Sequence, residues 1–108
     1  SVQSVAEAIT NHTLAKMDDF APPLLCLHAS SFARLNIRNP AVFEAIADRL
    51  AVAALSDVEE ERLSARDLTL AAYAFAKLGF NHQQLFSAIG TRAIEVVRDL
   101  TARDLQML

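Results

Sequence analysis

Two short stretches of the chain recur at a spacing of 37 residues, and this repetition limits the fold more than any other feature. Leu63-Ser-Ala-Arg-Asp-Leu68 matches Leu100-Thr-Ala-Arg-Asp-Leu105 at five of six positions, and Val5-Ala-Glu-Ala-Ile9 matches Val42-Phe-Glu-Ala-Ile46 at four of five. Residues 20–49 also align with residues 63–92 at a spacing of 43, which places a six-residue insertion around residues 56–61. Repetition of this kind is the signature of stacked structural units.

Each unit carries the apolar spacing of amphipathic helices. Apolar residues recur every three or four positions, as in the buried stripe of a helix, in two successive stretches: Leu68, Ala71, Ala72, Phe75 and Leu78, then Leu85, Ile89, Val96 and Leu100. With two glycines and three prolines among 108 residues, the chain has too little turn chemistry for a sheet-rich fold. The sequence therefore predicts an all-α protein.

Capping signals divide the chain into helices. Asn39-Pro40, Asn81-His-Gln-Gln84, Ser64-Ala-Arg-Asp67 and Thr101-Ala-Arg-Asp104 are typical of helix N-termini. Gly79 and Asn36 occupy equivalent positions that suit left-handed C-caps. These signals predict helices over residues 2–17, 22–35, 40–54, 65–78 and 82–97, with another beginning at 102.

The predicted unit is a helical hairpin, whose first helix we call helix A and whose second we call helix B. The chain then holds a helix B (2–17), a unit with a short acidic insertion (20–62), a second unit (63–99) and the start of a further unit (100–108). Such hairpins are stable only when stacked on their neighbours. We expect one α-solenoid segment of antiparallel helical hairpins, with flanking repeats in a longer chain.

Composition excludes several functional classes. The single cysteine, Cys26, cannot form an internal disulfide, and neither a signal peptide nor a membrane-spanning apolar run is evident. Cys26, His28 and Ser30 do not share a helix face as a catalytic triad would require. We also find no phosphate-binding glycine loop and no zinc spacing, so we expect no enzyme, no cofactor and no metal.

The second predicted unit carries the motif of a known family. Ala71-Ala-Tyr-Ala-Phe-Ala-Lys-Leu-Gly-Phe80 followed by Leu85-Phe86 resembles the heptatricopeptide and octotricopeptide repeats, and Ser31-Phe-Ala-Arg-Leu-Asn-Ile37 with Val42-Phe43 is a weaker copy. These families are organellar RNA-binding proteins, often ending in a RAP domain, which this chain does not contain. The resemblance implies RNA binding in mitochondria, or alternatively plastids, acting in RNA processing, stability or translation, or as a mitochondrial ribosomal protein on rRNA.

One stripe of the predicted A helices is the candidate RNA-binding surface. Spacings of three and four residues place Arg66, Thr69, Tyr73 and Lys77 on one exposed face. The equivalent positions are Pro23, Cys26, Ser30 and Arg34 in the preceding unit, and Arg103 and Gln106 in the following one. Regularly spaced cations can follow a phosphate backbone, and Tyr73 can stack on an unpaired base of a single strand. The predicted RNA-binding residues are Arg34, Arg66, Thr69, Tyr73, Lys77, Arg103 and Gln106.

Two other groups of charged residues bear on partners. Asp57, Glu59, Glu60 and Glu61 lie in the insertion, and without them the net charge changes from −3 to +1. This cluster is interpreted as a solvated loop, alternatively as a dock for a basic neighbour. Arg49 and Arg92 are expected to pair with acids. The alternative function is a protein–protein scaffold in a ribonucleoprotein or other large assembly, without RNA contact and without membrane contact.

Overall fold

The computed structural model describes the backbone of residues 2–106 and the side chains of residues 4–59 and 61–99. Every regular element in this part of the chain is a helix, which confirms the predicted all-α class. The α-helices are Val2–Ala15 (α1), Pro22–Arg34 (α2), Pro40–Ala54 (α3), Ala65–Leu78 (α4) and Gln83–Gln106 (α5). Short 3-10 helices at Met17–Asp19 and Glu59–Glu61 lie in two of the links. No described helix is both long enough and apolar enough to cross a membrane.

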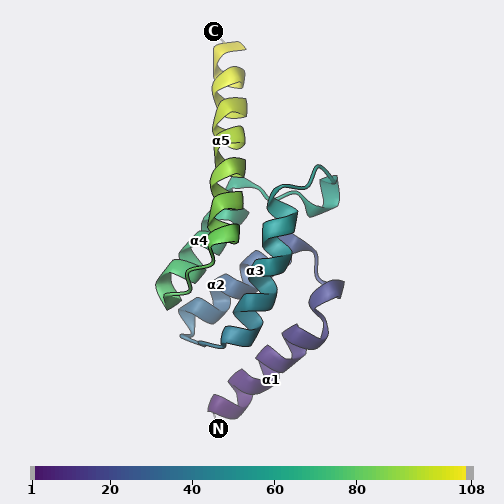
Figure 1. The fold of residues 1–108 in the computed structure, drawn as a ribbon, viewed down its shortest axis with the longest axis vertical. Helices are drawn as coiled ribbons and strands as arrows, with labels where there is room; N and C mark the ends of the chain where they lie inside the picture. The colour runs from purple at the N-terminus through teal and green to yellow at the C-terminus, as the bar shows by residue number, and fades with distance from the viewer. Residues whose placement is uncertain (1, 107–108) are drawn as a thin grey trace.

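Helices that hold equivalent positions in successive units lie side by side (Figure 1). The most extensive contact joins α2 to α4, while α3 packs against both α1 and α5. α2 and α4 begin 43 residues apart, and so do α3 and α5. The A helices α2 and α4 therefore form one layer, and the B helices α1, α3 and α5 form the other. The C-terminal part of α5 projects from the bundle, and the structure with this projection measures 57 × 25 × 23 Å.

An aromatic cluster joins the two hairpins. The ring of Phe43 on α3 has its centroid 5.1 Å from that of Phe75 on α4 and 4.8 Å from that of Phe80, in the α4–α5 link. Phe32 on α2 also contacts Phe43, with ring centroids 6.2 Å apart. Aromatic pairs at such separations contribute about 0.5–1.5 kcal/mol each beyond burial of their area. Phe43 therefore connects both A helices to the layer of B helices.

The local capping signals produce most of the predicted helix ends. The Asn39 side chain accepts a hydrogen bond from Val42 N at 3.1 Å, and Ser64 and Asp67 form a complete capping box at the start of α4. Gly79 ends α4 at φ 78°, and Asn36 follows α2 at φ 56°. The positions proposed for left-handed caps are thus confirmed.

Two predicted boundaries in the last unit differ from the structure. α5 starts at Gln83 with His82, not Asn81, as its cap, because His82 Nδ1 accepts the Leu85 N–H at 3.1 Å. The helix then runs to Gln106, through the position where a new helix was expected to begin. Residues 91–106 contain no glycine or proline, so no residue in this stretch forces the helix to stop.

The acidic insertion is attached to the B layer rather than fully solvated. The Glu61 carboxylate lies 3.7 Å from the Arg49 guanidinium of α3 and also accepts a hydrogen bond from Ser56 Oγ at 3.1 Å. Asp57 and Glu59 are exposed, as expected for a loop. Leu63, just beyond the insertion, is buried and returns the chain to the core.

The two glycines should respond oppositely to alanine. Gly79→Ala places a Cβ on a left-handed residue and should destabilise the fold by about 1 kcal/mol. Gly90→Ala, inside α5, should stabilise it by about 0.5–1 kcal/mol because alanine is the better helix former. A Cβ at either position meets no atom within 4 Å, so neither change has a steric component from neighbours. Urea unfolding followed by circular dichroism measures both, and shifts of the same sign would contradict the assignment.

Candidate nucleic-acid interface

The described cations of the predicted stripe lie on the layer of A helices. Arg34 and Lys77 are both exposed and lie in the last turns of the neighbouring helices α2 and α4, whereas Arg66 is exposed in the first turn of α4. The Lys77 ammonium lies over the ring of Tyr73, 5.6 Å from its centroid. Arg34 donates from Nη2 to Ser30 Oγ at 3.4 Å. The side chains of Arg103 and Gln106 lie outside the described residues.

Two members of the stripe in the first unit are not at the surface. Cys26 and Ser30 were expected to be exposed, like their counterparts Thr69 and Tyr73, but both have no exposed area. The prediction was wrong because α4 packs along this side of α2. α2 is covered by α3 on one side and by α4 on another. The apolar period of its own sequence shows only one covered side.

Thr69 and Tyr73 line an apolar groove rather than a polar surface. This α4/α5 groove has a volume of about 570 Å³. Its walls are Leu68, Thr69 and Tyr73, with two alanines, on α4, and Ile89, Val96 and Val97, with one alanine, on α5. Tyr73 and Val97 are 46% and 60% exposed, and Thr69 Oγ1 donates to its own helix at Ala65 O. A groove of this composition suits an apolar helix face better than phosphates.

The arginines of the B layer are held by acids, as predicted. Arg49 pairs with Glu61, and Arg92 Nη1 donates to Glu95 Oε2 at 2.7 Å. Arg92 is only 9% exposed. By contrast, Arg34, Arg66 and Lys77 form no ion pair with any other described residue. On the described B helices only Arg98 is likewise without an ion pair, whereas all three described cations of the A helices are unpaired.

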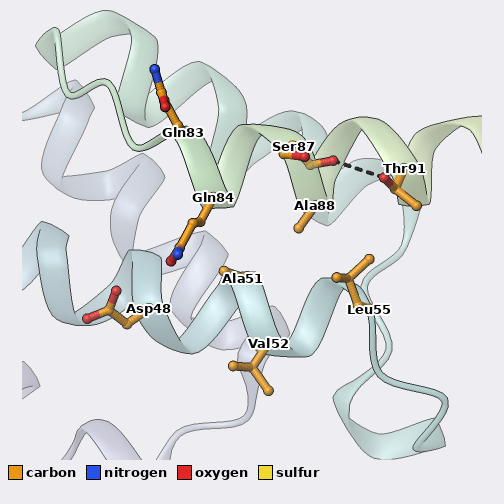
Figure 2. A pocket seen from close by; sticks show the side chains of 9 residues that line it. All are labelled: Asp48, Ala51, Val52, Leu55, Gln83, Gln84, Ser87, Ala88 and Thr91. Atoms are coloured by element: carbon orange, nitrogen blue, oxygen red, sulfur yellow. Dashed lines mark hydrogen bonds between the residues drawn. The ribbon is translucent and has the colours of Figure 1, made fainter.

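A second groove lies between the B helices α3 and α5 (Figure 2). Its volume is about 740 Å³, and it opens widely to solvent. Val52 on α3 and Leu55, just beyond its end, form the apolar side, while Gln84 points toward α3 from α5 and Ser87 and Thr91 line the groove further along α5. Neither a cation nor a ring lies in its lining, so it does not extend the candidate RNA surface.

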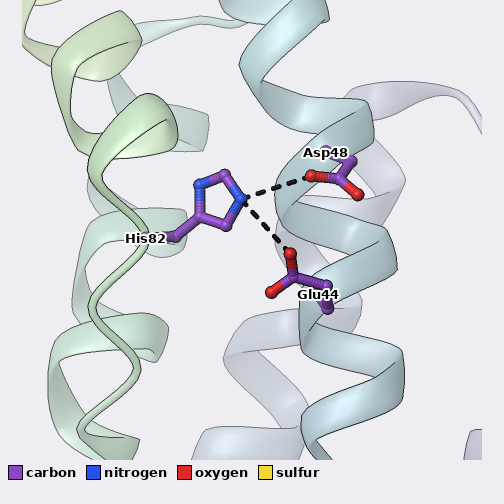
Figure 3. Close-up of side chains that lie close together, drawn as sticks. All are labelled: Glu44, Asp48 and His82. Atoms are coloured by element: carbon purple, nitrogen blue, oxygen red, sulfur yellow. Dashed lines mark hydrogen bonds and ion pairs between the residues drawn. The ribbon is translucent and has the colours of Figure 1, made fainter.

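His82 connects α5 to α3 through two carboxylates (Figure 3). Its Nε2 lies 3.3 Å from Asp48 Oδ1 and 3.8 Å from Glu44 Oε1, and these two acids follow one another by one turn of α3. A histidine beside two carboxylates is a set of residues that can hold a metal ion. The sequence reasoning missed the cluster, although the four-residue spacing of Glu44 and Asp48 was visible.

The hydrogen bonds of His82 assign the cluster a structural role. Because Nδ1 accepts the Leu85 N–H, the proton of the neutral ring is on Nε2, which points to the carboxylates. A metal at Nε2 would need the proton moved to Nδ1, where it would meet the Leu85 N–H. The ring thus caps α5 with one nitrogen and donates to α3 with the other.

Comparison with known proteins did not identify the chain: no family model matches it, and neither curated proteins nor solved structures gave a match. The assignment of the candidate interface therefore depends on the geometry of this chain alone.

The buried thiol of Cys26 should be inert in the folded protein. Burial, followed by the negative charge of Asp67, raises the pKa of Cys26 to about 12. At pH 8 its reaction with a thiol reagent should be slower than in the unfolded chain by about three orders of magnitude, because the thiolate is the nucleophile. Labelling in native buffer and in urea measures the ratio. Rates within tenfold of each other would place Cys26 at the surface after all.

Removing the His82 cap should destabilise α5. His82→Ala loses both the cap and the contact with α3, and we expect a loss of about 1–2 kcal/mol. His82→Asn can still cap the helix but does not reach α3, so it should recover about half of this loss. Chemical unfolding of the two variants tests the double role, and equal losses would show that capping does not contribute.

Proposed function

We propose that the chain is an α-solenoid segment of an organellar, mitochondrial RNA-binding protein, in which the A layer contacts the phosphates of single-stranded RNA or rRNA. The observation that carries the proposal is the distribution of free charge on the helices: all three described cations of α2 and α4 form no ion pair with a described residue, whereas two of the three described cations of the B helices, Arg49 and Arg92, are neutralised. A cation without a protein partner can exchange its counterions for phosphate, which is the main source of affinity for RNA.

The burial of the first unit supports the same surface. Arg34 stays exposed although Cys26 and Ser30 on the same helix are covered. Lys77, its counterpart 43 residues later, occupies the same place on α4 and is also exposed. The cations at the ends of the A helices thus remain accessible when units stack. Thr69 and Tyr73 contribute less to this interface because they line the apolar groove.

The resemblance to the heptatricopeptide and octotricopeptide repeats supports the same class of function. In that role the protein binds RNA during processing, stabilisation or translation, or within a mitochondrial ribosome, beside other proteins of the assembly. The part played by this chain is binding rather than catalysis.

A protein scaffold is the second candidate, and the apolar α4/α5 groove is the observation that favours it. In this function the groove and the exposed acids of the insertion, Asp57 and Glu59, contact protein partners. The two functions differ in what the free cations of the A layer do, and this difference can be measured.

Charge reversal of the A layer tests RNA binding. Arg34→Glu with Lys77→Glu should weaken binding of a short, mixed-sequence, single-stranded RNA. It should also reduce the slope of log affinity against log salt by about 1.4, at roughly 0.7 for each lost phosphate contact. Fluorescence anisotropy at several KCl concentrations measures both quantities.

Lys16→Glu with Arg98→Glu is the matched control, since it makes the same change in net charge at exposed positions outside the A-layer stripe. RNA affinity and salt slope should fall much less in this control. If the two double variants behave alike, or if the chain has no measurable affinity for RNA, the A layer is not an RNA interface and the scaffold function is favoured.

A further inference from the structure

We infer that the α4/α5 groove is the surface on which a further helix A packs, and that the segment beginning at Thr101 forms this helix. This contact is independent of RNA binding, and its test contains no RNA.

The exposed α4/α5 groove corresponds, in the register of the repeat, to a buried surface on α2 and α3. Each of the nine groove residues has a counterpart 43 positions earlier, on α2 or α3, and every one of these counterparts is buried. Thr69 corresponds to Cys26 and Tyr73 to Ser30, neither of which has any exposed area. Val97, 60% exposed, corresponds to Ala54, which is 1% exposed. The chain therefore already contains this surface in its occupied form.

The occupant of the first copy is a helix A. α4 lies along α2 in the most extensive contact of the structure, and its Asp67 is close enough to raise the pKa of Cys26. α4 begins with Ser64 as N-cap and buries Leu68 and Ala71, and Leu68 also lines the α4/α5 groove on the other side. These three features define what the second groove requires: a hydroxyl cap, an acid three residues later, and apolar residues one turn further on.

The segment beginning at Thr101 has all three features. Thr101 matches Ser64 and Asp104 matches Asp67, which repeats the capping box. Leu105 and Leu108 match Leu68 and Ala71, the first two of the five residues that α4 buries. In this arrangement residues 98–101 form a four-residue link between helices, which is a common length for helix–helix connections.

The occupied arrangement is an alternative to the straight end of α5. In the straight helix, residue 104 lies seven residues beyond Val97, about 10 Å further along the axis and outside the groove. In the occupied arrangement, position 104 lies near position 69, since α4 lies along α2 with Asp67 close enough to Cys26 to act on it electrostatically. The change from the straight helix to the occupied arrangement breaks helical hydrogen bonds around residues 98–101 and buries Tyr73, Val96 and Val97.

Tyr73 reports on the groove directly, because it is the single tyrosine of a chain without tryptophan. Leu105→Asp should release the segment and increase acrylamide quenching of Tyr73 fluorescence about twofold, as the population shifts to the open groove. Leu55→Asp, the same change at an exposed position outside the groove, should leave quenching unchanged. Equal quenching in the original chain and both variants would overturn the inference.

A proline at position 102 distinguishes the two arrangements. In a straight α5 it lies in the helix interior, where it costs about 3 kcal/mol and leaves Tyr73 as exposed as before. As the first residue of a new helix it is favourable, as Pro22 and Pro40 are at the starts of α2 and α3. Ala102→Pro should therefore lower the quenching of Tyr73. A rise, or no change, would contradict the proposed start of the helix.

Cross-linking gives a measurement that does not depend on fluorescence. In a Cys26→Ala background, Thr69→Cys with Asp104→Cys should be joined within one chain by a short bifunctional thiol reagent. The control pair, Val52→Cys with Asp104→Cys, places the first thiol on the other side of the B layer, facing the α3/α5 groove, and should not react. Absence of the first cross-link, or equal yields for both pairs, would show that the segment does not occupy the groove.

Discussion

The whole arrangement depends on the packing of one A helix against the next. A single hairpin has two apolar sides and can bury only one of them by itself, so α2 and α4 cover each other while Phe43 joins both to the B layer. The burial of Cys26 and Ser30 and the accessibility of Arg34 both follow from this contact. It also explains why equivalent side chains in the two units have different surroundings.

The features that the sequence predicted correctly are those controlled by a few neighbouring residues. The start of α4 was evident because Ser64 and Asp67 form a capping box within one turn, and its end because Gly79 adopts a left-handed conformation. Such interactions need no information about distant parts of the chain. The end of α2 before Asn36 and the start of α3 after Asn39 followed from the same kind of signal.

The features that the sequence did not predict depend on contacts between distant segments. His82 became the cap of α5 in place of Asn81 while its other nitrogen faced Asp48, 34 residues earlier. The covered side of α2 was missed because Cys26 and Ser30 are small and polar enough to pass for surface residues. At the candidate interface, the sequence located the cations and predicted that Arg49 pairs with an acid, but it did not identify Glu61 as that acid or show that Lys77 remains free.

The link between α3 and α4 can change in length without changing how the helices stack. It carries six extra residues, yet Leu63 re-enters the core and α4 packs fully along α2. Insertions and deletions there can consequently accumulate during evolution without disturbing the layers. Related chains should differ most in length at this link, so their common ancestry will be easier to detect when helices, rather than fixed periods, are aligned.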